Sequence, residues 1–386
     1  MKKTISVAVC AAALAATGGL AQADEAPNLP KSMVWTAYDL GSSGYAEASG
    51  IANAFQNRYG TRVRIIPSGT SIGRILPLTT GKATYGFLAN GAYFAAQGTY
   101  DFAVPEWGPQ DIRTVIGRLA TTALATAGDI DVKEISDLKG KRIGFVKGNP
   151  SVNVKNVGFL AFGGLTTDDV QQVWFGSYNA MKTAVIAGQL DAFSSVTTSA
   201  NVREIEASPR SITWPQFRPE NKDGWKAMTD IISFAAPSKE TKGAGITEEN
   251  PAWLVGIRYP IVTTYARTSE DEVYNMIKAM DVAFPDYKNT TASSENWAVE
   301  KAGRPPYDSP AHDGTIRYMK EKGWWSAEDQ AWQDKRLAQL NAALEAWDEA
   351  RGSFEQMRAE AQAKGEKIGD DKWADSWEKA RCEKLN

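Results

Sequence analysis

The sequence predicts an α/β protein of two lobes joined by crossing strands, with an extra helical segment at the C-terminus. Predicted strands alternate with polar, glycine-containing loops and helices, which is typical of a parallel sheet covered by helices. This alternation occurs in two separate blocks of the chain. After Gly323 the composition changes to Ala, Glu, Gln and Arg with apolar residues at heptad-like spacing, which indicates a long amphipathic helix.

The first block contains three predicted strands and two predicted helices. It begins with a buried strand at 33–38 and a helix at 45–58. A second strand at 62–66 precedes a second helix, which we expect Pro77 to interrupt because proline lacks the N–H that an inner turn needs. A third strand at 84–89 completes the block.

The second block repeats this order further along the chain. Its predicted strands are 142–146, 172–175 and 190–196, and its predicted helices are 153–162 and 178–187. The strand-to-helix loops of both blocks should face one cleft, because the carboxyl ends of parallel strands gather at one edge of a sheet.

Two segments, 113–127 and 253–266, are predicted to cross between the lobes. The stretch 215–252 is rich in Pro, Gly and charge, and we expect it to form a long loop. Hinged lobes are a usual way to enclose a small polar molecule. The predicted division assigns residues 24–120 and 214–325 to lobe 1, residues 121–213 to lobe 2 and residues 326–386 to the C-terminal extension.

Residues 1–23 have the pattern of a cleavable secretory signal. Two lysines precede an apolar run, and Ala21-Gln22-Ala23 forms an A-x-A site, so we expect cleavage after Ala23 and a periplasmic location. The formal net charge of −3 disfavours nucleic acid and anionic membrane surfaces as partners. Removal of the signal leaves Cys382 as the only cysteine, so no intramolecular disulfide is expected.

The sequence lacks the common motifs for cofactors, metals and catalysis. It has no glycine-rich phosphate loop, dinucleotide fingerprint or calcium loop, so no cofactor or metal is predicted. His312 is the only histidine, which excludes a multi-histidine metal site. We expect His312 to cap the following helix or to pair with a carboxylate, and we predict no catalytic residue. A hydrolase that uses a serine of the cleft stays open as an alternative.

The loops that end the strands carry the candidate site. Ser42-Ser43-Gly44-Tyr45 opens a helix, where free backbone N–H groups beside two hydroxyls can hold an anion. Ser68-Gly69-Thr70-Ser71 repeats the arrangement, and Arg74 one turn later could bind a carboxylate with two hydrogen bonds. Two alternatives stay open: the hydroxyls are only helix caps, and Arg74 is solvated. The predicted solute contacts are Ser42, Ser43, Tyr45, Thr70, Ser71, Arg74, Asn90, Ser151, Val152 (through its backbone), Asn153, Tyr178, Thr197 and Thr198.

Three further motifs accompany these loops: the run Asp137-Leu138-Lys139-Gly140-Lys141-Arg142, the turn Gly188-Gln189-Leu190-Asp191-Ala192, and the segment from Pro310 to Gly323 around His312. Together they resemble the TAXI family, the secreted solute receptors of tripartite ATP-independent periplasmic (TRAP) transporters, over residues 33–323. The resemblance implies a type II periplasmic binding protein fold, a small anionic solute (an organic acid or acidic amino acid) and a TRAP membrane permease as partner. A receptor for an ABC importer is the alternative within the same class.

The C-terminal extension carries an apolar stripe that must be buried; it runs through Leu337, Leu340, Leu344 and Trp347 and continues with Phe354 and Met357. A coiled-coil dimer could bury it, but the stripe is short and Gly352 interrupts it. We therefore predict a monomer whose C-terminal helix packs against its own lobes. Trp373 and Trp377, four residues apart, indicate that the last stretch docks as well.

Overall fold

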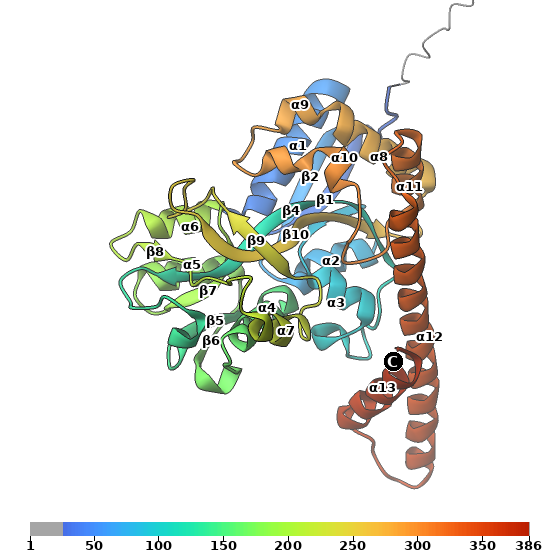
Figure 1. The fold of residues 1–386 in the computed structure, drawn as a ribbon. Helices are drawn as coiled ribbons and strands as arrows, with labels where there is room; N and C mark the ends of the chain where they lie inside the picture. The colour runs from blue at the N-terminus through green and yellow to red at the C-terminus, as the bar shows by residue number, and fades with distance from the viewer. Residues whose placement is uncertain (1–25, 386) are drawn as a thin grey trace, which may run out of the picture.

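The computed structural model describes residues 26–385 and shows a mixed α/β protein built on one ten-stranded sheet (Figure 1). The main path of the sheet runs β2-β1-β3-β10-β4-β7-β5-β6, while β8 pairs with β4 and β9 pairs with β10. The predicted fold class is therefore confirmed, and the predicted signal lies outside the described residues. The strands are β1 (Ser32–Ala37), β2 (Arg62–Pro67), β3 (Tyr85–Leu88), β4 (Ile112–Ala127), β5 (Arg142–Val146), β6 (Gln171–Phe175), β7 (Ala192–Val196), β8 (Ile212–Thr213), β9 (Ala236–Glu240) and β10 (Ala252–Tyr265).

Helices cover the sheet in two groups, which correspond to the two lobes (Figure 1). No helix within residues 26–385 is long and apolar enough to cross a membrane. Lobe 1 carries α1 (Ser43–Tyr59), α2 (Ser71–Thr79), α3 (Gly91–Gln97), α8 (Glu270–Val282), α9 (Phe284–Tyr287), α10 (Val299–Ala302) and α11 (Asp313–Glu321). Lobe 2 carries α4 (Pro150–Phe162), α5 (Tyr178–Ile186) and α6 (Ala200–Glu206), and α7 (Lys222–Thr229) packs beside α4.

The strands β4 and β10 are the two long crossing strands that the sequence predicts. They lie antiparallel in the middle of the sheet and pair from Ile112 opposite Tyr265 to Thr122 opposite Val255, with two register shifts on β10 between Arg258 and Thr263. β3 of lobe 1 pairs with one end of β10, and β7 of lobe 2 pairs with the far end of β4. The carboxyl ends of the lobe 1 and lobe 2 strands therefore approach each other over the middle of this pair.

Two local expectations are wrong. Helix α2 contains Pro77 and continues to Thr79, although it ends within one turn of the proline. The stretch 215–252 is not a long loop, because it contains α7 and the strand β9. These elements are short, and they are stabilised by tertiary contacts rather than by a strong local pattern: β9 pairs with β10, and the Trp225 ring packs against Phe162 of α4.

The contact between Trp225 and Phe162 also concerns the predicted division of the chain into lobes. Phe217 also packs against α4, with its ring centroid 5.1 Å from that of Phe159. The beginning of segment 214–325 thus lies beside lobe 2, whereas its later part, from α8 onward, packs in the core of lobe 1. The boundaries at 120/121, 213/214 and 325/326 remain predictions.

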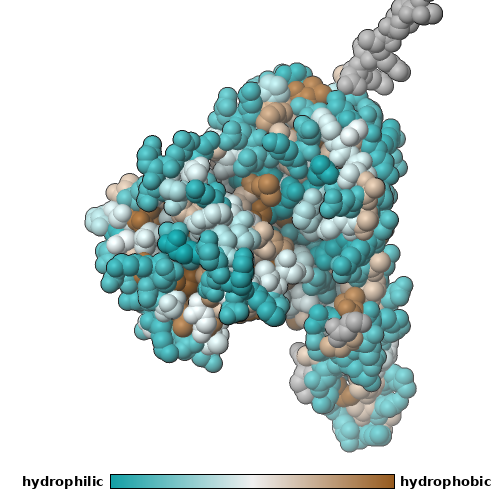
Figure 2. Space-filling view, viewed as in Figure 1, coloured by the Kyte–Doolittle hydropathy of each residue, from teal (hydrophilic) through white to brown (hydrophobic). Residues whose placement is uncertain are grey.

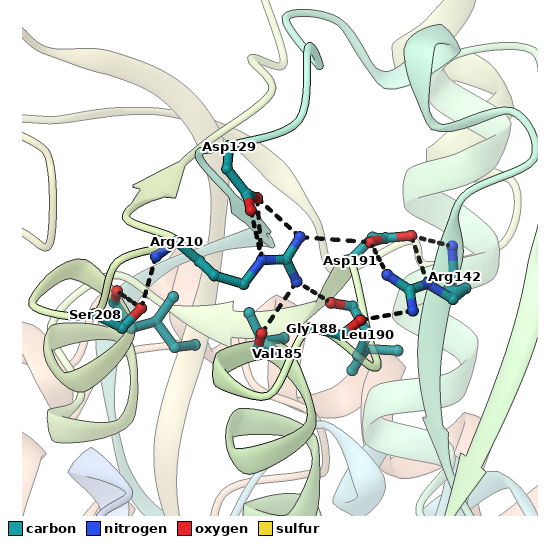
Figure 3. A network of polar contacts seen from close by, with 9 residues as sticks. Asp129, Arg142, Val185, Gly188, Leu190, Asp191, Ser208 and Arg210 are labelled. Carbon is teal, nitrogen blue, oxygen red and sulfur yellow. Dashed lines mark hydrogen bonds and ion pairs between the residues drawn. The ribbon is translucent and has the colours of Figure 1, made fainter.

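Lobe 2 contains a network of ion pairs that links two of the sequence motifs (Figure 3). The Asp191 carboxylate accepts hydrogen bonds from the backbone N–H, Nε and Nη2 of Arg142 at 2.6 to 3.0 Å. Arg210 pairs with Asp129 at 2.8 Å and also donates to the carbonyls of Val185 and Leu190. Burial raises the pKa of Asp191, but the hydrogen bonds from Arg142 outweigh it, so that this pKa lies below its ordinary value.

The C-terminal extension forms a helical hairpin of α12 (Ala327–Ala363) and α13 (Asp370–Leu385) along one side of the molecule (Figure 1). Trp373 and Trp377 pack edge-on against Trp347, with centroids 4.6 and 4.9 Å away. Their indole N–H groups donate to the carbonyls of Ala103 and Gly98 of the body, at 2.7 and 2.8 Å. The predicted docking of the extension on its own chain is confirmed, and α12 runs unbroken through position 352.

Candidate functional site

The predicted loops of the two lobes meet in a contact that we call the junction. The Ser71 hydroxyl donates to Asn149 Oδ1 at 2.9 Å, and Asn149 Nδ2 donates to the Gly69 carbonyl at 3.0 Å. The backbone of Ile72 donates to the Gly148 carbonyl at 3.2 Å. The junction consists of residues 38–45, 68–74 and 90–91 of lobe 1 with residues 148–155, 177–179 and 199–201 of lobe 2.

Glycine is required at position 69, where the loops of the two lobes meet. A Cβ added to Gly69 would lie 2.5 Å from Asp39 Oδ2 and 2.9 Å from the backbone nitrogen of Tyr178. Elsewhere in the junction, Asn179 Nδ2 of lobe 2 donates to the Leu40 carbonyl of lobe 1 at 2.5 Å. The glycine of this predicted loop therefore allows the lobes to close on each other.

Some predicted contact residues have structural roles. The Ser42 and Thr70 hydroxyls accept from the backbone N–H groups of Tyr45 and Gly73, so the helix-cap alternative is what the structure shows for these two. The Asn153 amide bonds to both the N–H and the C=O of Val146. Val152 is buried in the core, and Tyr45 is half-buried against the core of lobe 1.

Arg74 lies inside the junction. Its side chain is only 1% exposed, which excludes the solvated alternative. The guanidinium carbon lies 3.3 Å from the centre of the Tyr38 ring, and the two terminal nitrogens donate to the Ser68 carbonyl and the Ser71 hydroxyl at 3.3 Å. No carboxylate within residues 26–385 forms an ion pair with Arg74 within 4.0 Å. The Tyr178 ring also packs against Tyr38, tilted by 53° with its centroid 5.2 Å from that of Tyr38.

Several buried polar atoms of the junction have no hydrogen-bond partner among the described residues. Four of them belong to predicted contacts: Ser43 Oγ, Arg74 Nε, Asn90 Oδ1 and Ser151 Oγ. Native proteins pair the large majority of buried side-chain polar atoms, so a group of unpaired ones in one place requires an explanation. A bound solute or ordered water would supply the missing partners.

Two charged residues that the sequence analysis missed lie beside these atoms. Lys155 follows Ser151 by one turn of α4, is 6% exposed, and has neither an ion pair nor a hydrogen bond within the described chain. Burial lowers the pKa of Lys155 to about 8, while Asp308 acts to raise it. Burial raises the pKa of Asp308 to about 6, and Asn90 Nδ2 donates to both of its oxygens at 3.4 and 3.1 Å. The four-residue spacing from Ser151 was a signal for Lys155, whereas nothing local indicated Asp308.

A cavity of about 940 Å³ lies beside the junction, over the crossing strands. Thr197 and Thr198 are the only predicted contacts that line it. Their hydroxyls bond to Glu240 Oε2 at 3.1 Å and to the Ser293 hydroxyl at 2.7 Å. The predicted residues are thus divided between a packed junction and an open cavity, and β4, β9, β10 and α12 form the walls of the latter.

His312 has the capping role that the sequence predicts. Its Nδ1 accepts from the Gly314 N–H at 3.1 Å, and its Nε2 lies 3.0 Å from the Thr268 carbonyl. Both ring nitrogens are occupied by backbone groups, so neither contacts a serine hydroxyl. The part of the chain that the structure describes contains no group of His, Cys, Asp and Glu residues suited to a metal ion.

A two-lobed α/β protein with polar loops converging between its lobes belongs, as a class, with solute-binding proteins. The model of the NMT1-like family matches residues 40–323, and the chain belongs to this family. This membership confirms the coarser prediction, a protein of the periplasmic solute-binding class, and leaves the TAXI assignment untested. No curated protein matches the chain.

Solved structures of low identity are similar to the chain. The alkanesulfonate-binding protein SsuA from Xanthomonas axonopodis pv. citri, bound to MOPS, is 15% identical with a TM-score of 0.42, covering 82% of this chain and 93% of that chain. MatC from Rhodopseudomonas palustris with bound malate is 13% identical with a TM-score of 0.47, covering 78% and 98%. The periplasmic binding protein BugD is 9% identical with a TM-score of 0.47, covering 78% and 95%.

Proposed function

We propose that this protein is a periplasmic receptor that encloses a small organic acid or acidic amino acid between its lobes and delivers it to a TRAP membrane permease. It performs no catalysis in this role. The observation that carries the proposal is the group of buried, unpaired polar atoms on Ser43, Arg74, Asn90 and Ser151. These atoms come from both lobes, so a solute that binds them would hold the lobes together.

The charges at the junction favour an anion as the solute. Arg74 and Lys155 are buried cations, and neither has a carboxylate within ion-pair distance among residues 26–385. An unpaired buried charge is unfavourable, and a carboxylate from the solute would compensate it. The N-terminus of α4, thirteen residues long, adds the positive end of its helix dipole beside Ser151.

Binding can be tested directly with a thermal-shift panel of organic acids and amino acids, followed by calorimetry. A ligand at one hundred times its Kd should stabilise the protein by about 2.7 kcal/mol. Anions should raise the melting temperature, whereas matched neutral amides of the same acids should not. If the amides stabilise as well as the acids, the anion preference is wrong.

The transporter assignment needs a separate test, because TRAP and ABC receptors can bind the same solutes. Proteoliposomes that contain the cognate permease should take up the solute when an ion gradient is applied and the receptor is added. An uptake that instead requires ATP would favour the ABC alternative. Turnover of generic esters that disappears on Ser43→Ala or Ser151→Ala would favour the serine hydrolase.

A further inference from the structure

The large cavity beside the junction has a wall that comes from outside the family region. The family match ends at residue 323, yet one face of α12 lines the cavity through Trp332, Lys335, Arg336 and Gln339. These positions follow the i, i+3, i+4, i+7 spacing of a single helix face. Figure 2, viewed as Figure 1, shows hydrophobic side chains gathered in the middle of the face that β9 crosses, with hydrophilic residues around them.

Specific contacts hold this helix face in place. Gln333 accepts from the Ala311 N–H at 2.7 Å and donates to the Ala311 carbonyl at 3.1 Å. Asp329 pairs with Arg304 at 2.9 Å. Arg336 donates to the Asp308 carbonyl and lies 4.6 Å from the centre of the Tyr93 ring of α3. The wall is therefore a fixed part of the cavity rather than a helix that lies loosely over it.

The lining of the cavity carries more basic than acidic side chains, six against three. Arg118 is neutralised by Glu47 at 2.6 Å, and Lys242 pairs with Glu295 at 3.1 Å. Lys335 forms no ion pair or hydrogen bond with another described residue, and it lies exposed at the rim. The rim of this cavity therefore attracts anions.

Aromatic rings form much of the remaining lining. Tyr93, Phe234, Tyr307 and Trp332 all face the cavity. Trp332 is half-buried, and its ring meets that of Tyr307 edge-on at 5.9 Å. A volume of about 940 Å³ is near the upper end for small-molecule sites, roughly 300–1,000 Å³, and exceeds what a four-carbon acid fills.

We propose that α12 forms a wall of the solute site and gives it a preference for aromatic carboxylates, with Trp332 contacting the ring and Lys335 attracting the carboxylate. This inference rests on the proposed function, because it concerns the solute of the same receptor. It assigns the C-terminal extension a role in specificity. The junction and the cavity then act as two neighbouring parts of one site, bridged by Asp308, which lines the cavity and accepts from Asn90 of the junction.

The test is calorimetry of the full chain with two probes, succinate and 2-naphthoate. 2-Naphthoate should bind more tightly than succinate. Trp332→Ala should weaken 2-naphthoate binding by about tenfold or more, as expected for the loss of a stacked ring and its buried area, and should leave the affinity for succinate unchanged. Trp332→Phe keeps a ring and should recover most of the affinity. Lys335→Gln should weaken 2-naphthoate binding more at low salt than at high salt.

Arg351→Gln is the matched control, since it removes a charge from the same helix outside the cavity. Succinate binding without 2-naphthoate binding would overturn the inference and leave the proposed function intact. So would equal losses for both probes in Trp332→Ala, which would indicate a structural effect on the whole site. If no anion, including both probes, binds the wild-type protein, the proposed function fails and the inference fails with it.

Discussion

In lobe 2 the charges around Asp191 all have partners, whereas at the junction two buried cations have none. Asp129, Arg142, Asp191 and Arg210 form a continuous set of ion pairs and backbone hydrogen bonds (Figure 3). Arg74 and Lys155, by contrast, are buried and have no carboxylate within 4.0 Å in the described part of the chain. A satisfied network stabilises the fold, and an unsatisfied one indicates groups that are kept for a ligand.

The comparison also distinguishes residues that stabilise the fold from residues that we propose bind the solute. Arg142 and Asp191 belong to two of the motifs on which the predicted resemblance depends, and they pair with each other. Both residues therefore have a structural role in lobe 2. Arg74 and Lys155 lie outside those motifs, and it is at such positions that the identity of the solute should be determined.

The largest expected effect of a single change is on binding, at Arg74. Arg74→Ala should cost about 2–5 kcal/mol of binding free energy for an organic acid that stabilises the wild-type protein, because the carboxylate would lose a buried, hydrogen-bonded partner. Calorimetry measures it, with Arg64→Ala on the exposed face of β2 as the control. Unchanged affinity in Arg74→Ala would remove Arg74 from the solute site.

The junction is also supported by the extension, because α12 holds the segment that carries Asp308. Truncation after Gly323 removes the contacts of Gln333, Trp373 and Trp377 with the body. At about 1 kcal/mol for each lost hydrogen bond, we expect a loss of roughly 3–4 kcal/mol in the free energy of unfolding. Urea denaturation measures this loss. Light scattering should give a monomer for both chains, and a dimer for the full chain alone would contradict the predicted monomer.

Asp191→Ala tests whether the paired charges of lobe 2 stabilise the fold without affecting the solute. It leaves Arg142 without its carboxylate, so we expect a loss of about 2–3 kcal/mol in the free energy of unfolding, with little change in solute affinity. Asp129→Ala is the matched control in the same network, because Asp129 is half exposed and its pair with Arg210 should contribute about 1 kcal/mol or less. A loss of solute binding in Asp191→Ala would mean that the network does more than stabilise lobe 2.

Much of the fold could be predicted from the sequence because its signals are local. Strand β5 was predicted with the correct bounds, and both crossing strands within one residue at each end. The elements α7 and β9 were missed since they depend on packing against α4 and on pairing with β10.

The site was less accessible to sequence reasoning. Arg74 and Ser71 could be placed at the start of a predicted helix, which brings them to the junction. Asp308 could not, because it reaches Asn90 from 218 residues away through the packing of a segment without regular structure. The contribution of α12 to the cavity could not be predicted either. Local patterns indicate that an apolar stripe is buried, but not which residues the helix contacts.

Lys155→Met tests whether an unpaired buried cation of the junction destabilises the protein without solute. In the protein without solute, Lys155 is a buried charge without a partner, and an apolar side chain of similar length should raise the free energy of unfolding by about 1 kcal/mol. The same variant should bind the solute anion more weakly. Lys147→Met, an exposed lysine in the loop before α4, should change neither quantity. A destabilised variant with normal affinity would show that Lys155 is structural.

The last prediction is a pH dependence of stability at Asp308. Its pKa in the folded protein is about 6, above its ordinary value of 3.8, because burial outweighs the hydrogen bonds from Asn90 and the charges of Arg336, Lys155 and Arg258. Between about pH 4 and pH 6 the folded state therefore keeps a proton that the unfolded state has lost. The contribution of Asp308 to stability is fully present below about pH 4 and declines as the pH rises to 6.

Asp308→Asn cannot ionise and isolates this contribution from the other carboxylates. The unfolding free energy of the wild type minus that of Asp308→Asn should fall by about 2 kcal/mol from pH 4 to pH 6 and change little from there to pH 7. Urea melts at half-unit pH intervals measure the difference. A difference that rises over this window would mean that Asp308 is ionised and paired in the folded protein, which would place it among the satisfied charges, with Asp191.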